Sequence, residues 1–591
     1  MRSTSAPRLR TPSAGAGLSS HFSSRWLQRL LEVEPAHLSP EWAGRLHLER
    51  VASPSGRQRH HRRWGSESAT LERREAGRED VVLSRIRQRC LSGHPIIGFM
   101  APVSAHVRSA QFEALQRDRL PEAWMADLPG STVPHVLVTL PSFDLDRAVY
   151  DHYGDRVPPL ENRYLFALLR AREPATEVVC LSSLPVPDAI LDGYLSLLAP
   201  SERSRVLARS RLVCADDPSW RPLAEKLLDR GDVVDTLRSY VRERPAILEP
   251  WNVGPAEEEL SVALGIPANG TGTSHSHLAT KSNGRQLLRA AGVDVPEGTE
   301  DVTAPADVVA AVRRLVRFRP LVREVVVKLD DSVAGDGNVR VPVTTVTDSA
   351  DDLQATDDVS RLLPPWYVDV LKRGGIVEQL IEGDEFRSPS AQAAIAPDGK
   401  VTVIGTHEQR LGGANGQVFE GATFPADPDY ASLLGRQTHQ VGLQLARNGA
   451  VGRFSVDFVA TRRSSGGRWD LYGIEINLRK GGTTHTLGLL RLLRGGHYDA
   501  EQGQYADVSG RPVCYAATDN LVRPEWVSRS PAEVRQRVSD AGLDYNRTTG
   551  VGVVLHLLDC LEVDGRMGYT AMAESADEAT QLESQLITAL S

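Results

Sequence analysis

The sequence predicts an α/β and α+β multidomain protein, and three observations carry that prediction. A chain of 591 residues is too long for one hydrophobic core and indicates roughly three to four domains. Strand-like and helix-like segments alternate over residues 131–274, which is typical of a parallel sheet covered by helices. Residues 454–479 read as two strands around a Ser-Ser-Gly-Gly turn, which is typical of an antiparallel hairpin.

The composition restricts the function classes. Hydrophobic residues make up 41% of the chain and charged residues 24%, as in soluble globular proteins. The net charge of −8 gives no reason to expect a nucleic-acid partner. The five cysteines form no C-x-x-C pair, which favours a reducing, cytoplasmic location. No apolar run reaches the roughly 18 residues of a membrane span, so we expect no membrane partner.

The N-terminal part is predicted to carry no chemistry. Residues 1–80 are rich in Arg and Ser and show no sustained hydrophobic period, so we expect a disordered extension. Residues 81–130 remain unassigned.

A parallel α/β domain is expected over residues 131–274. Its expected strands lie within 133–144, 176–186 and 210–217, and its expected helices within 161–172, 188–198 and 221–230. No G-x-G-x-x-G turn follows the first strand, which argues against a dinucleotide site.

The next expected domain covers residues 275–500. A short helix beginning at Lys281 is expected to end at Gly292. The remaining expected elements are strands at 323–329, 339–345, 374–381 and 401–409, and a helix at 430–446. Residues 501–591 predict a small α+β domain, with a strand at 551–561, a turn at Gly565, and a helix opened by a capping box from Ser575 to Glu578.

The hairpin at residues 454–479 predicts a metal site. Asp457 lies nine residues before Gly466 and Glu475 nine after it, so the two carboxylates should face each other across the ladder. Because side chains alternate along a strand, Glu475 and Asn477 share that face. Oxygen ligands of this kind suit Mg²⁺. The alternative is a solvated polar face on an exposed hairpin.

Two further segments are compatible with nucleotide binding. Lys328 ends an apolar run and precedes a loop with Gly335, Gly337 and Asn338, whose backbone N–H groups could turn toward phosphates; an ordinary β-turn is the alternative. Glu378 and Glu385 flank apolar Leu380 and Ile381, a slot that suits adenine with a carboxylate for ribose. The alternative for this second segment is two surface glutamates at a strand end.

The order of these features resembles the ATP-grasp superfamily over residues 275–495. The segments EINLRKGGTTHTLGLLRLL (475–493), GQVFEGATFPAD (416–427) and GRMGYTAMAESADEA (565–579) resemble the pheganomycin-type peptide ligases. The resemblance extends over residues 131–591. It implies an ATP-grasp fold at 275–500, preceded by a parallel α/β pre-ATP-grasp domain at 131–274 and followed by a family-specific C-terminal domain at 501–591.

The resemblance implies ATP and Mg²⁺ as cofactors, with Mn²⁺ as an alternative metal. Lys281 and Lys328 would contact the phosphates, and the loop of Gly335, Gly337 and Asn338 would close over them. Glu378 and the backbone near Ile381 would hold adenine, and Glu385 would hold ribose. The implied metal ligands are Asp457, Glu475 and Asn477.

A catalytic arginine is also implied. Arg479 would lie beside the transferred group and stabilise its negative charge. In D-alanine–D-alanine ligases an arginine precedes the metal aspartate by two residues, and Ser455 occupies that position here. Arg453 lies on the same strand face, so Arg453 and Arg479 are both candidates.

The implied activity is that of an ATP-dependent carboxylate–amine ligase, which forms an amide through an acylphosphate and releases ADP and phosphate. Its substrates would be small-molecule or peptide acids and amines. Two alternatives stay open. An ATP-grasp enzyme that uses another nucleophile, such as a thiol, would share these residues. A non-enzymatic ATP-binding module would tolerate the loss of a metal ligand or a phosphate-binding lysine, whereas here all three ligands and both lysines are present. Whether the protein forms a homo-oligomer is left open.

Overall fold

The computed structural model describes residues 105–145, 147–330, 337–412, 418–464 and 466–591. The chain divides at Arg74/Glu75 into two units, and every described residue belongs to the second. The expectations for residues 1–80, for 81–104 and for Gly335 lie outside the described residues. Within the described part, no helix combines the length and the apolar character needed to cross a membrane.

The first sheet is the predicted parallel one. Its order is β3-β2-β1-β4, and all three pairings are parallel. The strands are β1 (His135–Leu140), β2 (Thr176–Ser182), β3 (Ser210–Cys214) and β4 (Ala246–Pro250). One face packs apolar side chains such as Val136, Val138 and Leu248 against helices α9 (Leu223–Leu228), α10 (Gly231–Val241) and α11 (Pro255–Leu264). The strand–helix alternation in the sequence therefore predicted this architecture correctly.

One expected α-helix of this part is wound more tightly. Residues Asn162–Arg172 form the 3₁₀ helix η3. A 3₁₀ helix has three residues per turn, so side chains three apart lie above one another. Leu165, Leu168 and Ala171 have that spacing and are all buried in the same core cluster. Tertiary burial of this row thus accompanies the tight winding, which a search for a period of 3.6 residues does not detect.

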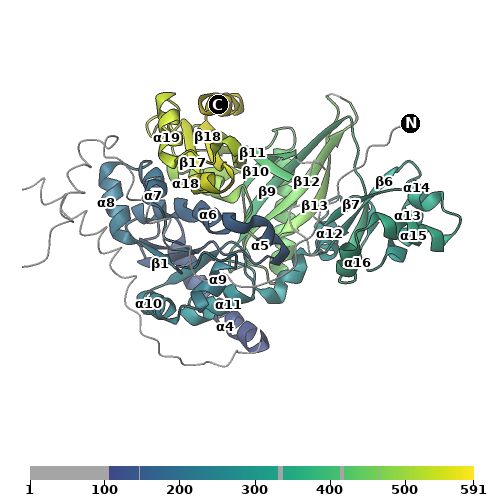
Figure 1. Ribbon diagram of the computed structural model, residues 1–591, viewed down its shortest axis with the longest axis horizontal. Helices are drawn as coiled ribbons and strands as arrows, with labels where there is room; N and C mark the ends of the chain where they lie inside the picture. The colour runs from purple at the N-terminus through teal and green to yellow at the C-terminus, as the bar shows by residue number, and fades with distance from the viewer. Residues whose placement is uncertain (1–104, 146, 331–336, 413–417, 465) are drawn as a thin grey trace, which may run out of the picture. The chain divides into compact units, whose positions relative to one another are not determined.

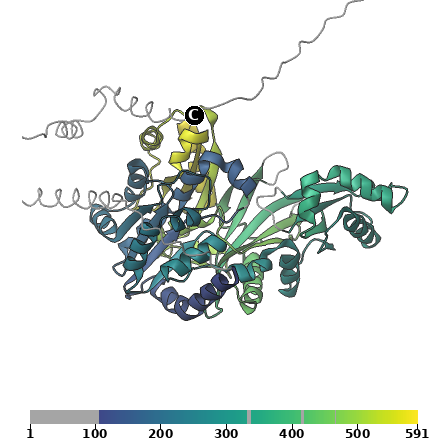
Figure 2. The same ribbon diagram turned by 60° about the horizontal axis from the view of Figure 1, so that its bottom comes forward.

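A small antiparallel sheet follows, in the order β5-β8-β6-β7. Its strands are β5 (Gly298–Thr299), β6 (Glu324–Leu329), β7 (Asn338–Pro342) and β8 (Gly375–Gln379). Helices α13 (Pro305–Phe318) and α15 (Asp352–Leu362) share one apolar core with it, and Figures 1 and 2 show these teal helices beside the strands. Helix α12 (Lys281–Ala290) precedes the sheet and is capped by the Thr280 side chain.

The largest sheet has eight antiparallel strands in the order β13-β12-β9-β10-β11-β16-β18-β17 (Figure 1). Its first five are β9 (Glu385–Ile395), β10 (Val401–Gly412), β11 (Val418–Phe424), β12 (Gly452–Arg462) and β13 (Asp470–Asn477). Along β12, buried Phe454, Val456 and Phe458 alternate with half-buried polar residues. The apolar face shares a core with α17 (Ala431–Arg447), so the polar side chains of β12 point to the opposite face.

The C-terminal segment adds three strands to this sheet: β16 (Cys514–Val522), β17 (Gly552–His556) and β18 (Arg566–Ala573). The expected strand at 551–561 ends at His556, because Leu557 takes a left-handed backbone conformation (φ 54°) and short helical turns follow. Helix α21 (Ala576–Leu590) is capped at Ser575, whose side chain accepts a hydrogen bond from Glu578 N.

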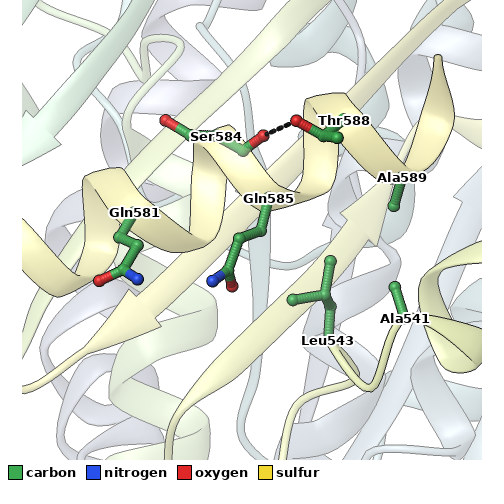
Figure 3. Close-up of a pocket in the computed structure, with 7 residues that line it drawn as sticks. All are labelled: Ala541, Leu543, Gln581, Ser584, Gln585, Thr588 and Ala589. Atoms are coloured by element: carbon green, nitrogen blue, oxygen red, sulfur yellow. Dashed lines mark hydrogen bonds between the residues drawn. The ribbon is translucent and has the colours of Figure 1, made fainter.

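A shallow hollow of about 510 Å³ lies between α21 and the loop after α19 (Pro531–Asp540) (Figure 3). Gln581, Gln585 and Ala589 line it from α21, and Ala541 and Leu543 face them from the loop. None of the residues expected to carry chemistry lines this hollow.

Candidate active site

The predicted carboxylate pair is present in the hairpin. Strands β12 and β13 pair with Asp457 opposite Glu475, and with Ser455 opposite Asn477. A β-bulge after Asp457 shifts the register beyond it. Asn477 Nδ2 donates a hydrogen bond to Asp457 Oδ2 (3.0 Å), and Gln409 Nε2 donates one to Asp457 Oδ1 (3.2 Å). The hairpin arithmetic is therefore confirmed, and Gln409 joins the group.

The two carboxylates have opposite electrostatic behaviour. Burial and the facing charge of Glu475 raise the pKa of Asp457 to about 7. Burial also works against ionisation of Glu475, but the charges of Lys281, Arg479 and Lys328 lower its pKa overall. Two carboxylates held face to face in this way are stabilised by a cation between them.

The residues fit Mg²⁺. Two carboxylates and the Asn477 amide offer hard oxygen ligands on one sheet face, and such a set leaves positions for phosphates and water. Across the described ranges, no group of three or more His, Cys, Asp or Glu side chains is placed to hold a metal ion.

Lys281 reaches this face from α12. Its Nζ lies 3.4 Å from Glu475 Oε1, and its side chain is buried. The first turn of α12 is pinned to the end of β6, because Ser282 N donates to Asp330 Oδ1 (2.8 Å). The helix start, the small sheet and the large sheet therefore meet at Lys281.

Lys328 and Glu378 form a buried ion pair between neighbouring strands of the small sheet. The other oxygen of Glu378 lies 2.5 Å from Arg285 Nη1, and Arg285 also donates to Glu300 Oε1 (2.7 Å) and to Pro296 O (2.6 Å). The carboxylate of Glu378 thus holds two cations. Its expected contact with adenine stays a prediction.

Arg285 was missed by the sequence analysis. The available signal was its position four residues after Lys281, which places the two side chains on one helix face. It is one of the largest fully buried side chains of the described part.

The end of the glycine loop is held by backbone and tyrosine contacts. Leu329 N donates to Gly337 O (3.1 Å), and Asn338 pairs with Lys328 across the β6–β7 ladder. The Tyr367 hydroxyl lies 2.8 Å from Gly337 O and 2.9 Å from Val327 O, so its single proton is shared between the two carbonyls. The loop therefore leaves and rejoins the sheet directly beside Lys328.

Glu385 begins β9, seven residues after Glu378. Arg462 Nη2 donates to Glu385 Oε2 (2.7 Å), and the two residues pair across the β9–β12 ladder. Ile381 is half-buried in the segment that joins β8 to β9. The two glutamates are thus bonded to different cations in different sheets, and the link between them carries Ile381.

The two candidate arginines, Arg453 and Arg479, lie in different electrostatic surroundings. The charge of Arg479 lowers the pKa of both Asp457 and Glu475, so Arg479 lies near the carboxylate pair. Arg453 instead has Arg491 and Glu249 as its strongest electrostatic neighbours. The catalytic roles of both arginines stay predictions.

Lys480, next to Arg479, is a second residue that the sequence analysis missed. Its backbone N donates to Trp251 O (3.1 Å), and its buried Nζ lies 3.0 Å from Glu249 Oε1. Both partners lie at the end of β4 in the parallel sheet. The only sequence signal was that few lysines occur among many arginines, which does not indicate a partner.

Comparisons with known proteins identify relatives of this chain. The family model described as the PGM1 C-terminal domain matches residues 533–586. An L-propargylglycine–L-glutamate ligase of Streptantibioticus cattleyicolor is 33% identical over 444 residues, covering 72% of this chain and 90% of that protein.

Solved structures are less similar in sequence to this chain than the Streptantibioticus ligase is. A biotin carboxylase complex from Campylobacter jejuni is 13% identical, with a TM-score of 0.46 over 76% of this chain and 89% of that one. An ADP complex of N5-carboxyaminoimidazole ribonucleotide synthetase is 14% identical, with a TM-score of 0.44 over 78% of this chain and 97% of that one. The identity and coverage shared with the Streptantibioticus ligase place the relationship at the level of the family, and this chain belongs to the pheganomycin-type peptide ligases of the ATP-grasp superfamily.

Proposed function

We propose that this protein is an ATP-dependent carboxylate–amine ligase that joins two amino-acid or peptide substrates through an amide bond. The observation that carries the proposal is the convergence of Asp457, Glu475 and Asn477 with Lys281 on one polar sheet face. The name of the 33% identical relative supports amino acids as the substrate class.

The chain offers a separate group for each part of ATP. Lys281 and Lys328 supply positive charge for the phosphates, and the loop ending at Gly337 and Asn338 would cover them. The segment around Ile381 would hold adenine, and Glu385 would accept hydrogen bonds from the ribose hydroxyls. Arg462 orients the Glu385 carboxylate for that role.

Asp457, Glu475 and Asn477 would hold Mg²⁺, with Mn²⁺ as an alternative. A bound divalent cation neutralises charge on the phosphates during transfer. Arg479 lies close enough to both carboxylates to influence their ionisation, so it is placed to stabilise charge on the transferred phosphoryl group.

The reaction has two steps. A carboxylate oxygen of the first substrate attacks the γ-phosphorus, the bond to the β-bridging oxygen breaks, and ADP leaves. The amine of the second substrate then attacks the acyl carbon, phosphate leaves with the bonding electrons, and the amine loses a proton. The protein contributes positioning and charge compensation, and it must exclude water from the acylphosphate.

ADP release tests the proposal. The protein is incubated with Mg²⁺, ATP, L-glutamate and L-propargylglycine, and then with a pool of other amino acids and dipeptides. We expect acid-dependent ADP release and, with hydroxylamine in place of the amine, a hydroxamate. Lys328→Ala should lower both by at least about 100-fold, because the phosphates lose the ammonium that positions them. Lys372→Ala, at an exposed lysine paired with Asp369, is the matched control.

The two alternatives give different results. Hydroxamate formation with thiols as the productive acceptors would indicate the other nucleophile. Tight MgATP binding without ADP release or hydroxamate, for every acid tried, would indicate a binding module and contradict the ligase.

A further inference from the structure

Lys480 is a buried lysine that the proposed reaction does not yet use. Only six of the 68 lysine and arginine side chains of the chain are lysines, so a lysine at a buried position indicates a need for the compact ammonium. Lys480 is 5% exposed and directly follows Arg479, the arginine near the carboxylate pair. A buried ammonium is stable only with close polar partners. The partners of Lys480 therefore determine what it holds in place.

The side chain of Lys480 is bound to the end of β4. Its Nζ lies 3.0 Å from Glu249 Oε1 and donates a hydrogen bond to Pro250 O. The ammonium also lies 5.9 Å from the centre of the Tyr164 ring, where it is attracted to the ring face. The other oxygen of Glu249 accepts from Asn269 Nδ2 (2.6 Å), so this carboxylate is held from both sides.

The backbone of Lys480 is held at both of its polar groups. Its N–H donates to the carbonyl of Trp251 (3.1 Å), the residue that follows β4. Its own carbonyl accepts a hydrogen bond from Arg479 Nη1 (3.3 Å). A change in the side-chain contacts of Lys480 would therefore move the carbonyl to which the guanidinium of Arg479 is bound.

The chain after Lys480 is fixed separately, to the large sheet. Gln392 of β9, which is 4% exposed, donates from Nε2 to Thr483 Oγ1 (2.8 Å) and accepts at Oε1 from Thr484 Oγ1 (3.2 Å). Because the following residues are held in this way, loss of the Lys480 anchor would mainly displace the segment before them, which carries Arg479.

Arg479 lies at the edge of the predicted metal site. It is two residues after Asn477, so the Cα atoms of these residues are at most about 7 Å apart. Asn477 in turn donates to Asp457 Oδ2 (3.0 Å). In agreement with that distance, the charge of Arg479 acts to lower the pKa of Asp457 and of Glu475. Apart from the bond to Lys480 O, its guanidinium makes no hydrogen bond within the described ranges, so its other donors are available to a phosphoryl group.

We propose that Lys480 is a positioning residue for phosphoryl transfer, which anchors Arg479 to the end of β4 and thereby aims its guanidinium at the transferred group. This role rests on the proposed function, in which Arg479 acts on that group. Lys480 itself would not touch substrate, because its ammonium is already bound to Glu249 and to Pro250 O. Donors that are fixed in advance stabilise developing charge without reorganising. The anchor thus gives the parallel sheet a part in the reaction.

A double-mutant cycle tests whether Lys480 acts through Arg479. ADP release by the full-length protein is measured with Mg²⁺, ATP, L-glutamate and hydroxylamine, for Arg479→Met, Lys480→Met and the double variant. We expect kcat to fall about 100-fold in Arg479→Met, which removes the donor, and about 10-fold in Lys480→Met, which misplaces it. The double variant should equal Arg479→Met, because Lys480 then has no guanidinium to position.

The separate effects on kcat and KM distinguish positioning from a general loss of structure. The KM for ATP should stay within about twofold in Lys480→Met, since Lys281 and Lys328 remain to bind the phosphates. Lys400→Met, at an exposed lysine between β9 and β10, is the matched control and should keep both constants. If Lys480→Met does not fold, Glu249→Gln takes its place in the cycle, because this change keeps an acceptor oxygen and removes the charge that holds Lys480.

Binding of ADP with aluminium fluoride, a mimic of the transferred phosphoryl group, gives a readout without turnover. Isothermal titration should show that fluoroaluminate strengthens MgADP binding to the unmodified protein. This gain should be smaller in Lys480→Met and in Arg479→Met, and no smaller in the double variant than in Arg479→Met. Affinity for MgADP alone should not change.

Failure of the ligase and failure of the anchor give different results. A fluoroaluminate gain that depends on Lys480, without ADP release for any acid, would contradict the ligase and support the anchor. The positioning role of Lys480 is overturned if the losses of the two single variants multiply in the double variant, if Lys480→Met raises the KM for ATP without lowering kcat, or if fluoroaluminate gives no gain in the unmodified protein.

Discussion

Asp457 and Glu475 should respond in opposite directions when each is neutralised without metal. Asp457 has a raised pKa because it is buried opposite Glu475, so its charge destabilises the folded state. Glu475 has a lowered pKa because Lys281, Arg479 and Lys328 surround it, so its charge stabilises the folded state. Asp457→Asn should therefore raise the melting temperature of the metal-free protein at pH 8, and Glu475→Gln should lower it.

The magnitude follows from the pKa of Asp457. If the whole rise of this pKa from 3.8 to about 7 appeared in the free energy of unfolding, it would correspond to about 4 kcal/mol. The side chain is only half-buried, so solvent screening reduces the expected effect to the order of 1–2 kcal/mol. For a protein of this size that corresponds to a melting shift of a few degrees.

The raised pKa of Asp457 also determines how the stability change of Asp457→Asn varies with pH. A carboxyl whose folded pKa lies above its unfolded pKa contributes stability at low pH and loses it as pH rises toward 7. The stabilising effect of Asp457→Asn should thus be fully present at pH 8 and reduced to roughly 40% of that value at pH 5. Mg²⁺ should stabilise the unmodified protein at pH 8 but neither variant, since each has lost a charged ligand.

Differential scanning fluorimetry in a chelator, at pH 5 and pH 8, with and without added Mg²⁺, measures all of these effects. Asp470→Asn, at the exposed start of β13, is a suitable control and should shift nothing. A fall in melting temperature for Asp457→Asn at pH 8, or an equal rise at both pH values, would refute the electrostatic reasoning.

Three further predictions concern the nucleotide side of the site. Arg285→Met should lower the free energy of unfolding, measured with urea, by about 3–5 kcal/mol, because Glu378 loses one of its two buried cationic partners. Arg289→Met, at the exposed end of the same network, should lower it by under about 1 kcal/mol. Glu385→Gln should raise the KM for ATP about tenfold in steady-state assays with little change in kcat, since ribose binding is equal in ground and transition states; a selective loss of kcat would exclude the ribose role. Tyr367→Phe should lower stability by about 1–2 kcal/mol and raise the KM for ATP, because its hydroxyl holds Gly337 O and Val327 O, and unchanged kinetics would separate this tyrosine from the loop.

The sequence predicted best what local pairing determines. A short turn between two alternating strands leaves few registers, and the one that buries Val456 and Ile476 also sets Asp457 opposite Glu475. Likewise, Lys328 could be placed at a strand end because the apolar run before it reads as a buried strand. Such features depend on residues close together in the chain.

Features that depend on distant segments could not be predicted. The pairing of Arg285 with Glu378 joins residues 93 positions apart, and nothing in either segment indicates the other. Strand β9 was not expected because its polar residues Ser390 and Gln392 do not suggest a central strand, yet both are buried between neighbouring strands. The sequence could not predict which of Arg453 and Arg479 lies beside the carboxylate pair. The charged neighbours of Arg453, Arg491 and Glu249, lie far from it along the chain.

The polar face of β12 carries a like-charge pair at Asp457. Asp457 and Glu475 face each other across the hairpin, and the charges of Lys281, Arg479 and Lys328 favour the ionised form of Glu475. A cation between the two carboxylates would relieve their repulsion, which is why the loss of either charge should abolish stabilisation by Mg²⁺. Because side chains alternate along a strand, β12 presents these charges on one face while it buries Val456 in the apolar core on the other.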